Sequence, residues 1–215
     1  MTLIPTIILS TLVLLSGAIT IRAIYREADQ QIHLFKPLTT ALILAIALFN
    51  SDPVSITYKN LIAAGLVASL IGDVALMLPD ERWFLYGLLS FLGAHVVYIT
   101  AFTMENDGMA AWYYAVPFGL FALLMLFTLW PHLGSMRGPV FVYMVVIMFM
   151  AWQAASRWLN NPDVRSTQLA LAGAYLFVAS DSVLAIQRFR GTWRSASFWV
   201  MSTYYTAQWL IALSV

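Results

Sequence analysis

The chain contains no cysteine, which excludes disulfide bonds, thiolate nucleophiles and cysteine-ligated metal sites. Charged residues are also scarce, at 10% of the 215 residues against about 25% in an ordinary soluble domain. With 61% of the residues hydrophobic, there is too little charge to cover a water-facing surface. The net charge of +1 and the lack of a dense Lys/Arg cluster argue against a nucleic-acid partner. The composition therefore predicts a polytopic membrane protein.

Two signals typical of other protein classes are also missing. No Lys or Arg precedes the first apolar run, residues 3–21, whereas Arg22 and Arg26 follow it. A secretory signal peptide carries its positive charge in front, so we expect this run to be a retained membrane span. The chain has no G-x-S-x-G, HExxH or P-loop motif, so serine hydrolase, zinc protease and NTPase activities have no support.

Eight apolar stretches are long enough to cross a bilayer, which takes about 20 residues per helix. Short segments rich in Pro, Gly, Asn and Asp separate them, and these are turn signals. The expected spans are 3–24, 36–51, 58–78, 84–104, 111–130, 139–158, 167–187 and 195–214. The sequence thus predicts an all-α fold, with eight transmembrane helices in one membrane bundle and a single domain over residues 1–215. We expect Lys36-Pro37 to open the second span, with Lys36 reaching to the lipid headgroups.

The positive charges are unevenly divided between the two sides of this bundle. The loops after the first, third, fifth and seventh spans share one side, which has eight of the eleven Lys and Arg residues. The positive-inside rule makes that side cytoplasmic and places both termini outside the cytoplasm. Because an all-helical pattern does not fit an outer-membrane barrel, we expect an integral protein of the bacterial inner membrane.

The third and seventh spans resemble each other over a short stretch. Residues 66–76 match 177–185 loosely, and Lys36-Pro37 matches residues 137–139 at the start of the sixth span. Four spans followed by four equivalent spans would form a parallel internal repeat. Low-complexity apolar sequence produces the same similarity, so both interpretations stay open.

Two aspartates lie inside predicted spans, Asp73 in the third and Asp181 in the seventh. Intramembrane acids are costly, usually face the bundle interior or a wet cavity, and are often functional. Both lie roughly 7–9 Å from the cytoplasmic ends of their spans, given the helical rise. Two facing carboxyls in a low dielectric do not both ionise, which leaves one acid and one base. Alternatively, hydroxyls of Ser69, Ser180 or Ser182 bind the aspartates, which then only hold helices together.

Further polar side chains lie within the fourth and eighth spans. His95 is suited to carrying a proton and shares a helix face with Tyr98, although a lone intramembrane histidine also serves as an interhelical hydrogen-bond donor. Tyr204, Tyr205 and Gln208 form one stripe, too deep for an interfacial aromatic belt. Only one histidine accompanies the aspartates, so no zinc site is expected.

Several cations lie near the depth of the aspartates. Lys36, Arg188, Arg190 and Arg194 are candidates to bind a phosphate headgroup. Setting the membrane topology explains the same residues equally well.

Taken in order, these segments resemble the YhhN-like family of integral membrane lysoplasmalogenases. The similarity covers most of the chain from Lys36 onward, and the first span contributes nothing to it. The matching segments are Lys36-Pro37, SLIGDVALM at 69–77, GLLSFLGAHVVY at 87–98, ASDSVLA at 179–185 and YYTAQ at 204–208.

The resemblance implies hydrolysis of the vinyl ether bond of a lysoplasmalogen, a lysophospholipid drawn from the bilayer, to a fatty aldehyde and a glycerophospho-ethanolamine or -choline. We expect Asp73 and Asp181 to be the acid/base pair, assisted by His95, with no cofactor. The expected substrate-binding residues are Lys36, Ser69, Tyr98, Ser180, Arg188, Tyr204, Tyr205 and Gln208. A proton-coupled transporter of small molecules or lipids and a structural lipid-binding bundle are the alternatives.

Overall fold

The computed structural model of the chain describes residues 3–106, 108 and 110–215, and within them the regular structure is entirely helical. Short 3₁₀ turns flank the fifth helix. The helices are α1 (Leu3–Tyr25), α2 (Asp29–Leu48), α3 (Ile56–Met77), α4 (Glu81–Met104), α5 (Val116–Leu129), α6 (Arg137–Asn160), α7 (Arg165–Phe189) and α8 (Ala196–Leu213). The predicted all-α fold is confirmed.

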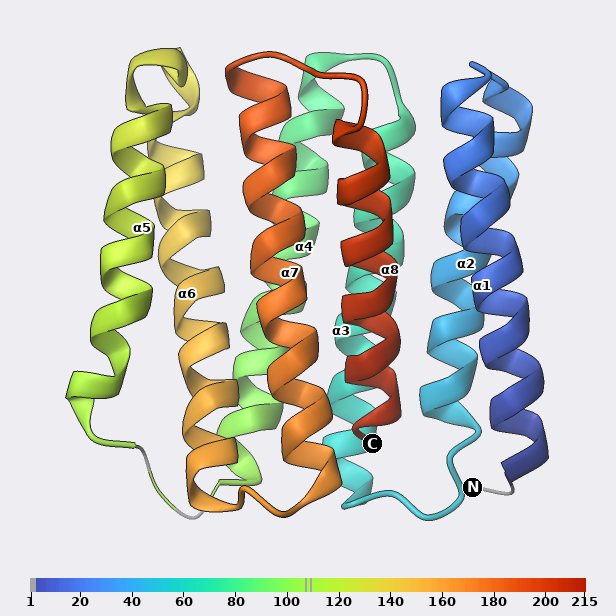
Figure 1. Cartoon of the computed structure of the whole chain (residues 1–215), viewed down its shortest axis with the longest axis vertical. Coiled ribbons are helices and arrows are strands. Elements are labelled where there is room, and N and C mark those ends of the chain that lie inside the picture. The colour runs from blue at the N-terminus through green and yellow to red at the C-terminus, as the bar shows by residue number, and fades with distance from the viewer. Residues whose placement is uncertain (1–2, 107, 109) are drawn as a thin grey trace.

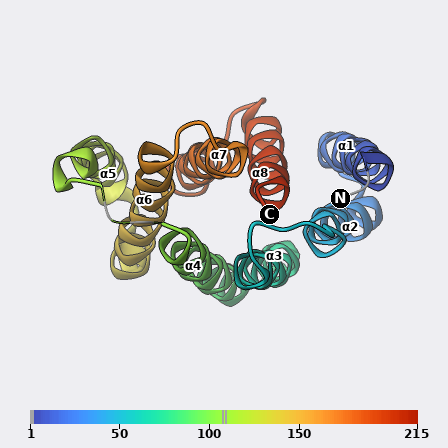
Figure 2. The ribbon, with the colours of Figure 1, turned by 90° about the horizontal axis from the view of Figure 1, so that it is seen from below.

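The helices stand side by side and alternate in direction, so both termini lie toward the same end of the bundle (Figure 1). Viewed along the helices, α1, α8 and α7 form one row and α2, α3 and α4 the other (Figure 2). Helix α6 follows at one end of the two rows, and α5 lies outermost beside it (Figure 2). The space between the two rows is where side chains from distant parts of the sequence meet.

The surface of the bundle is apolar, as expected for a protein solvated by lipid. Within the described residues, seven helices are long and apolar enough to cross a membrane. The remaining helix, α8, is rich in Ser, Thr, Tyr and Gln, and it packs against α1, α2, α3 and α7. Large exposed side chains such as Leu14, Leu123 and Phe127 suit contact with acyl chains rather than water. The chain is therefore an integral membrane protein.

Turn and cap residues set several of the helix boundaries. The Ser55 side chain accepts a hydrogen bond from the Tyr58 backbone N–H at 3.0 Å and caps α3. Asp80 caps α4 in the same way, through the Arg82 N–H at 3.0 Å. These caps satisfy backbone donors that the first turn of a helix leaves free.

The start of α2 differs from the sequence prediction. The helix begins at Asp29 and passes through Pro37, so Lys36-Pro37 does not open it. Membrane helices tolerate an internal proline because neighbouring groups satisfy the freed carbonyl. Lys36 consequently lies about two turns inside the helix and is only 7% exposed. The expectation that it reaches the headgroups was wrong.

Glycines allow the closest approaches between helices. A Cβ atom added at Gly72 would lie 2.6 Å from the Phe91 ring, so α3 and α4 pack as closely as they do because Gly72 has no side chain. At Gly173 the obstacle would be backbone, because the added Cβ would lie 2.8 Å from the Ala207 carbonyl oxygen on α8. The α7–α8 contact therefore depends on Gly173.

A buried cation joins four helices at the end of the bundle where α3 and α7 begin. Arg157 of α6 is 2% exposed and donates to the Tyr58 hydroxyl and to Ser166 Oγ, each at 3.0 Å. Its guanidinium lies 4.5 Å from the centre of the Tyr58 ring, which adds a cation–π attraction. The Tyr58 hydroxyl also pairs with Ser214 Oγ at the end of α8, at 2.8 Å. These contacts fix the ends of α3, α6, α7 and α8 to one another.

We predict that Gly173→Ala lowers the free energy of unfolding by about 1–3 kcal/mol, because overpacking a fixed backbone contact separates α7 from α8. The thermal unfolding midpoint of the purified protein in detergent measures this. Gly93→Ala is the matched control, since an added Cβ there meets nothing within 4 Å. Equal midpoints for the two variants would contradict the assigned role of Gly173.

Candidate active site

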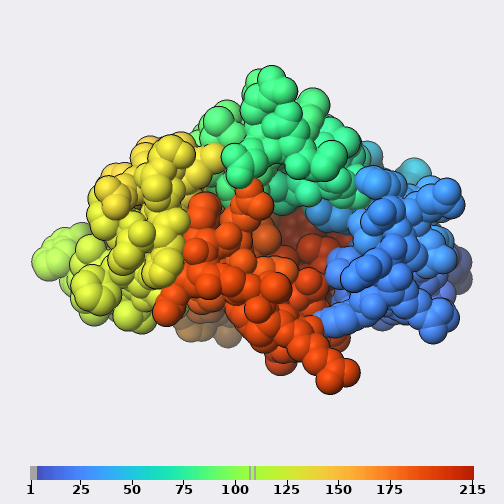
Figure 3. All heavy atoms as spheres, turned by 90° about the horizontal axis from the view of Figure 1, so that it is seen from above, coloured from blue at the N-terminus to red at the C-terminus, as the bar shows by residue number. Residues whose placement is uncertain are grey.

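A cavity of about 580 Å³ lies inside the bundle, and all eight helices contribute to its wall. It is found near the end at which α3 and α7 finish and α4 and α8 begin. Viewed onto that end, the molecule is hollowed between the α1–α2, α3–α4 and α7–α8 segments (Figure 3). The wall is mostly apolar, but it includes Asp73, Asp181 and Lys36.

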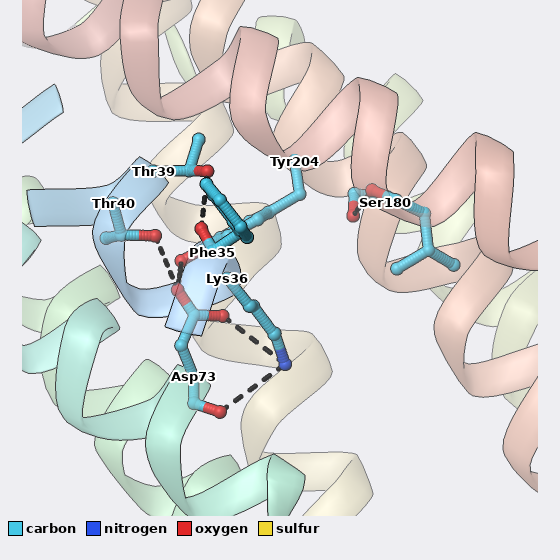
Figure 4. A network of polar contacts seen from close by, with 8 residues as sticks. Phe35, Lys36, Thr39, Thr40, Asp73, Ser180 and Tyr204 are labelled. Atoms are coloured by element: carbon cyan, nitrogen blue, oxygen red, sulfur yellow. Dashed lines mark hydrogen bonds and ion pairs between the residues drawn. The ribbon is translucent and has the colours of Figure 1, made fainter. Parts of the chain in front are cut away.

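Asp73 is held by side chains from two other helices (Figure 4). Its Oδ2 accepts hydrogen bonds from Thr40 Oγ1 at 2.6 Å and from the Tyr204 hydroxyl at 2.7 Å. Lys36 Nζ lies 3.6 Å from Oδ1 and donates to the Asp73 backbone carbonyl at 3.4 Å. Asp73 is 1% exposed, so this ion pair is almost completely shielded from water. The carboxylate thus has a cation and two hydroxyl donors, which is the environment of a stable buried anion.

Asp181 has a simpler environment. It is partly exposed to the cavity, and its Oδ2 accepts a hydrogen bond from the Tyr143 hydroxyl of α6. Among the described residues, it has no cationic partner and no direct contact with Asp73. The two acids therefore share one cavity, but they have separate partners and unequal exposure.

Serine hydroxyls do not bind either aspartate in the described part of the chain. These hydroxyls instead donate hydrogen bonds to backbone carbonyl oxygens, either of their own helix or of a neighbouring helix. The bonds are Ser69 to Gly65 at 3.0 Å, Ser180 to Val200 at 3.0 Å and Ser182 to Val178 at 2.7 Å. The alternative in which neighbouring serines hold the aspartates was wrong, because tyrosine and threonine hydroxyls from other helices do so.

His95 lies behind the cavity wall rather than in it. Its ring packs edge-on against Tyr143 at 5.2 Å and against Phe177 at 4.7 Å, measured between ring centres. It is completely buried, and neither ring nitrogen has a hydrogen-bond partner among the described residues. His95 therefore supports Tyr143, which contacts Asp181, and does not itself line the cavity.

Only one member of the predicted polar stripe on α8 reaches the cavity, and that is Tyr204. Gln208 Oε1 accepts a hydrogen bond from the Tyr98 hydroxyl at 2.8 Å, and both residues are fully buried away from it. Tyr205 is also buried outside the cavity. The Tyr98–Gln208 hydrogen bond links α4 to α8 outside the cavity.

The mouth of the cavity is polar. Arg188 is exposed, and its guanidinium lies 4.6 Å from the centre of the Phe84 ring. Gln187 Nε2 lies 3.3 Å from both Thr192 Oγ1 and Ser197 Oγ, which also line the cavity. Arg188 has no carboxylate partner in the described residues. A cation and neutral hydrogen-bonding groups thus stand at the opening. Arg190 and Arg194 do not line it.

Sequence reasoning missed two residues of the site, Thr40 and Tyr143. Thr40 follows Lys36 by one helical turn, so the shared helix face was a usable signal once Lys36 was placed inside the helix. Tyr143 lies in a strongly apolar stretch, and its depth is the only sign that it is not an interfacial aromatic.

A family model and several known proteins match this chain in sequence. The family model described as the YhhN family matches residues 31–215. Over 71% of its residues, this chain is 38% identical to the lysoplasmalogenase TMEM86A of Bos taurus. Over 73% of its residues, it is 33% identical to the lysoplasmalogenase TMEM86B of Homo sapiens. The matches cover 64% of the length of each of these two relatives.

A bacterial relative matches over almost the whole chain. The membrane protein YhhN of Escherichia coli O157:H7 is 29% identical over 94% of this chain and 96% of its own length. No solved structure matches. The family match includes the two aspartates and all of the partners named above, and the chain belongs to the YhhN family.

Proposed function

We propose that this protein hydrolyses the vinyl ether bond of lysoplasmalogens, releasing a fatty aldehyde and a glycerophospho-ethanolamine or -choline. The observation that carries the proposal is one apolar cavity with two carboxyl groups in its wall and a polar mouth. The names of the mammalian relatives, which are lysoplasmalogenases, support this substrate. A lysoplasmalogen has the matching arrangement, because its vinyl ether bond lies between a polar headgroup and a long aliphatic chain.

The reaction requires the protein to fill three roles. Protonation of the β-carbon of the alkenyl chain converts the vinyl ether into an oxocarbenium ion. Water then adds to this cation, a base takes the proton from the water, and the hemiacetal breaks down to aldehyde and alcohol. The protein must supply a proton donor, a negative charge near the cation and a base for the water.

The contacts of the two aspartates divide these roles. Asp73 has Lys36, Thr40 and Tyr204 as partners, which stabilise it as an anion. Asp181 has one neutral partner and faces the cavity, so we assign the proton transfer to the β-carbon to it. Asp73 would then stabilise the oxocarbenium ion and accept the proton from water. Because Lys36 is occupied by Asp73, Arg188 at the mouth is the better candidate to bind the phosphate.

The position of the cavity agrees with a cytoplasmic site. Its mouth lies at the end that has most of the Lys and Arg residues, and the positive-inside rule makes this end cytoplasmic. We propose that the protein lies in the bacterial inner membrane with both termini outside the cytoplasm. A single lipid leaflet would then supply the substrate.

The activity itself is tested with purified protein in detergent and a lysoplasmalogen substrate. We predict stoichiometric release of fatty aldehyde and the glycerophosphodiester, measured by mass spectrometry. A transporter needs two compartments and releases no aldehyde in detergent, so the absence of product would reject the hydrolase. An alkyl ether lysolipid, which has no vinyl group to protonate, is the negative control.

Removing either acid should abolish this turnover. We predict that Asp73→Asn and Asp181→Asn each lower kcat by about 10²–10⁴-fold, the usual contribution of general acid–base catalysis. Asp163→Asn, in the exposed α6–α7 loop, is the control and should keep full activity. The thermal unfolding midpoint of each variant shows whether activity is lost because the protein no longer folds. This control is most important for Asp73→Asn, because Asp73 is buried. Near-normal turnover by a folded Asp181→Asn variant would reject the assigned proton donor.

Tyr143 should position Asp181 through its hydroxyl. We predict that Tyr143→Phe lowers kcat by about 10-fold or more, in line with the loss of one hydrogen bond to a charged or reacting group, while KM changes little. Tyr175→Phe is the matched control, because this tyrosine is exposed on the outer surface of α7. A change in KM alone would indicate that Tyr143 contacts substrate instead.

A further inference from the structure

The cavity extends away from the two acids into an apolar part between α5, α6 and α7. We call this part the methionine arm, and six residues of α5 and α6 define it. They are Met125, Leu129, Val140, Met144, Ile147 and Met148. None of these side chains offers a conventional hydrogen bond, so the arm suits only an apolar occupant.

Most of the arm lies outside the main core of the bundle, and it meets that core at Ile147 and Met148. Met125, Leu129, Val140 and Met144 belong, with Leu133, to a hydrophobic cluster of their own, distinct from the core that joins α2, α3, α4, α6, α7 and α8. Met125 and Leu129 are also the only described residues of α5 that are buried. Helix α5, outermost in the bundle (Figure 2), therefore forms one wall of the arm with these two side chains, and it exposes other large residues such as Leu123, Leu124 and Phe127 to the lipid.

The arm begins beside the proposed catalytic groups. Tyr143, which donates to Asp181, directly precedes Met144 on α6. Asp181, Arg188 and the arm residues all line this one cavity, so a molecule with its reacting bond at Asp181 can reach both the polar mouth and the arm. Methionine side chains are flexible and polarisable, and they adapt to the different bends of an aliphatic chain.

We propose that the methionine arm binds the single aliphatic chain of the lysophospholipid and makes turnover depend on chain length, an inference that rests on the proposed function. A chain too short to enter the arm gains no apolar contact there. A chain that fills it holds the vinyl ether at Asp181. The arm thus selects for the chain, and the mouth selects for the headgroup.

The test compares lysoplasmalogens that have eight-carbon and sixteen-carbon alkenyl chains. Met125→Trp fills the arm from the α5 side, and we expect it to lower kcat/KM for the sixteen-carbon substrate at least 10-fold relative to the eight-carbon substrate. Leu124→Trp is the matched control, because Leu124 is 61% exposed toward the lipid, and both substrates should stay within twofold of wild type. Equal losses for both substrates with Met125→Trp, or no loss for either, would overturn the proposal.

A second variant and a second measurement keep the test decisive. If Met125→Trp does not fold, Met125→Ala enlarges the arm instead and should shift the preference toward chains longer than sixteen carbons; an unchanged preference rejects the arm. Binding of uncleavable alkyl ether lysolipids, followed by native mass spectrometry, tests the arm without any reaction. Wild-type protein could release no aldehyde and still bind the sixteen-carbon lipid more tightly than the eight-carbon lipid. If the Met125→Trp variant then lacks this binding preference, the proposed hydrolase activity is rejected and the proposed chain-binding site is supported.

Discussion

The buried Lys36–Asp73 ion pair is the contact on which the rest of the site depends. It joins α2 to α3, and the Tyr204 hydroxyl attaches α8 to the same carboxylate. Removing one member of a buried pair leaves an uncompensated charge and commonly costs about 3–5 kcal/mol. The two helix rows are thus held together at the depth of the cavity, and Asp73 keeps its position there even though the surrounding wall is apolar.

The composition of α8 follows from the same constraint. This helix lies among α1, α2, α3 and α7 and supplies hydrogen-bond partners to its neighbours. Tyr204 binds Asp73, Gln208 binds Tyr98, and Ser214 binds Tyr58. A helix used in this way needs polar side chains at several depths, which makes it less apolar than the helices that face lipid. Its polarity thus comes from its contacts inside the bundle.

The helices and the two intramembrane acids could be predicted from the sequence, because apolar length and a rare carboxylate are local signals. The partners of the acids could not, since Thr40, Tyr143 and Lys36 reach them from other helices and only packing brings them together. Pro37 misled the placement of Lys36, because a proline that normally marks a helix start lies inside α2. Because of that error, neither the depth of Lys36 nor its ion pair with Asp73 was predicted.

The two halves of the site are unequal, and this bears on the predicted internal repeat. In each half the helix before the acid contributes a hydroxyl, Thr40 for Asp73 and Tyr143 for Asp181. Within the part of the chain that the structure describes, Asp73 alone of the two acids has a cationic partner. The repeat itself stays a prediction. Equivalent halves would give two carboxyls of equal character, whereas acid–base chemistry requires two that differ. Lys36 on one side, and the cavity exposure of Asp181 on the other, create that difference, and in the proposed reaction this asymmetry would let one carboxyl donate a proton while the other acts as base.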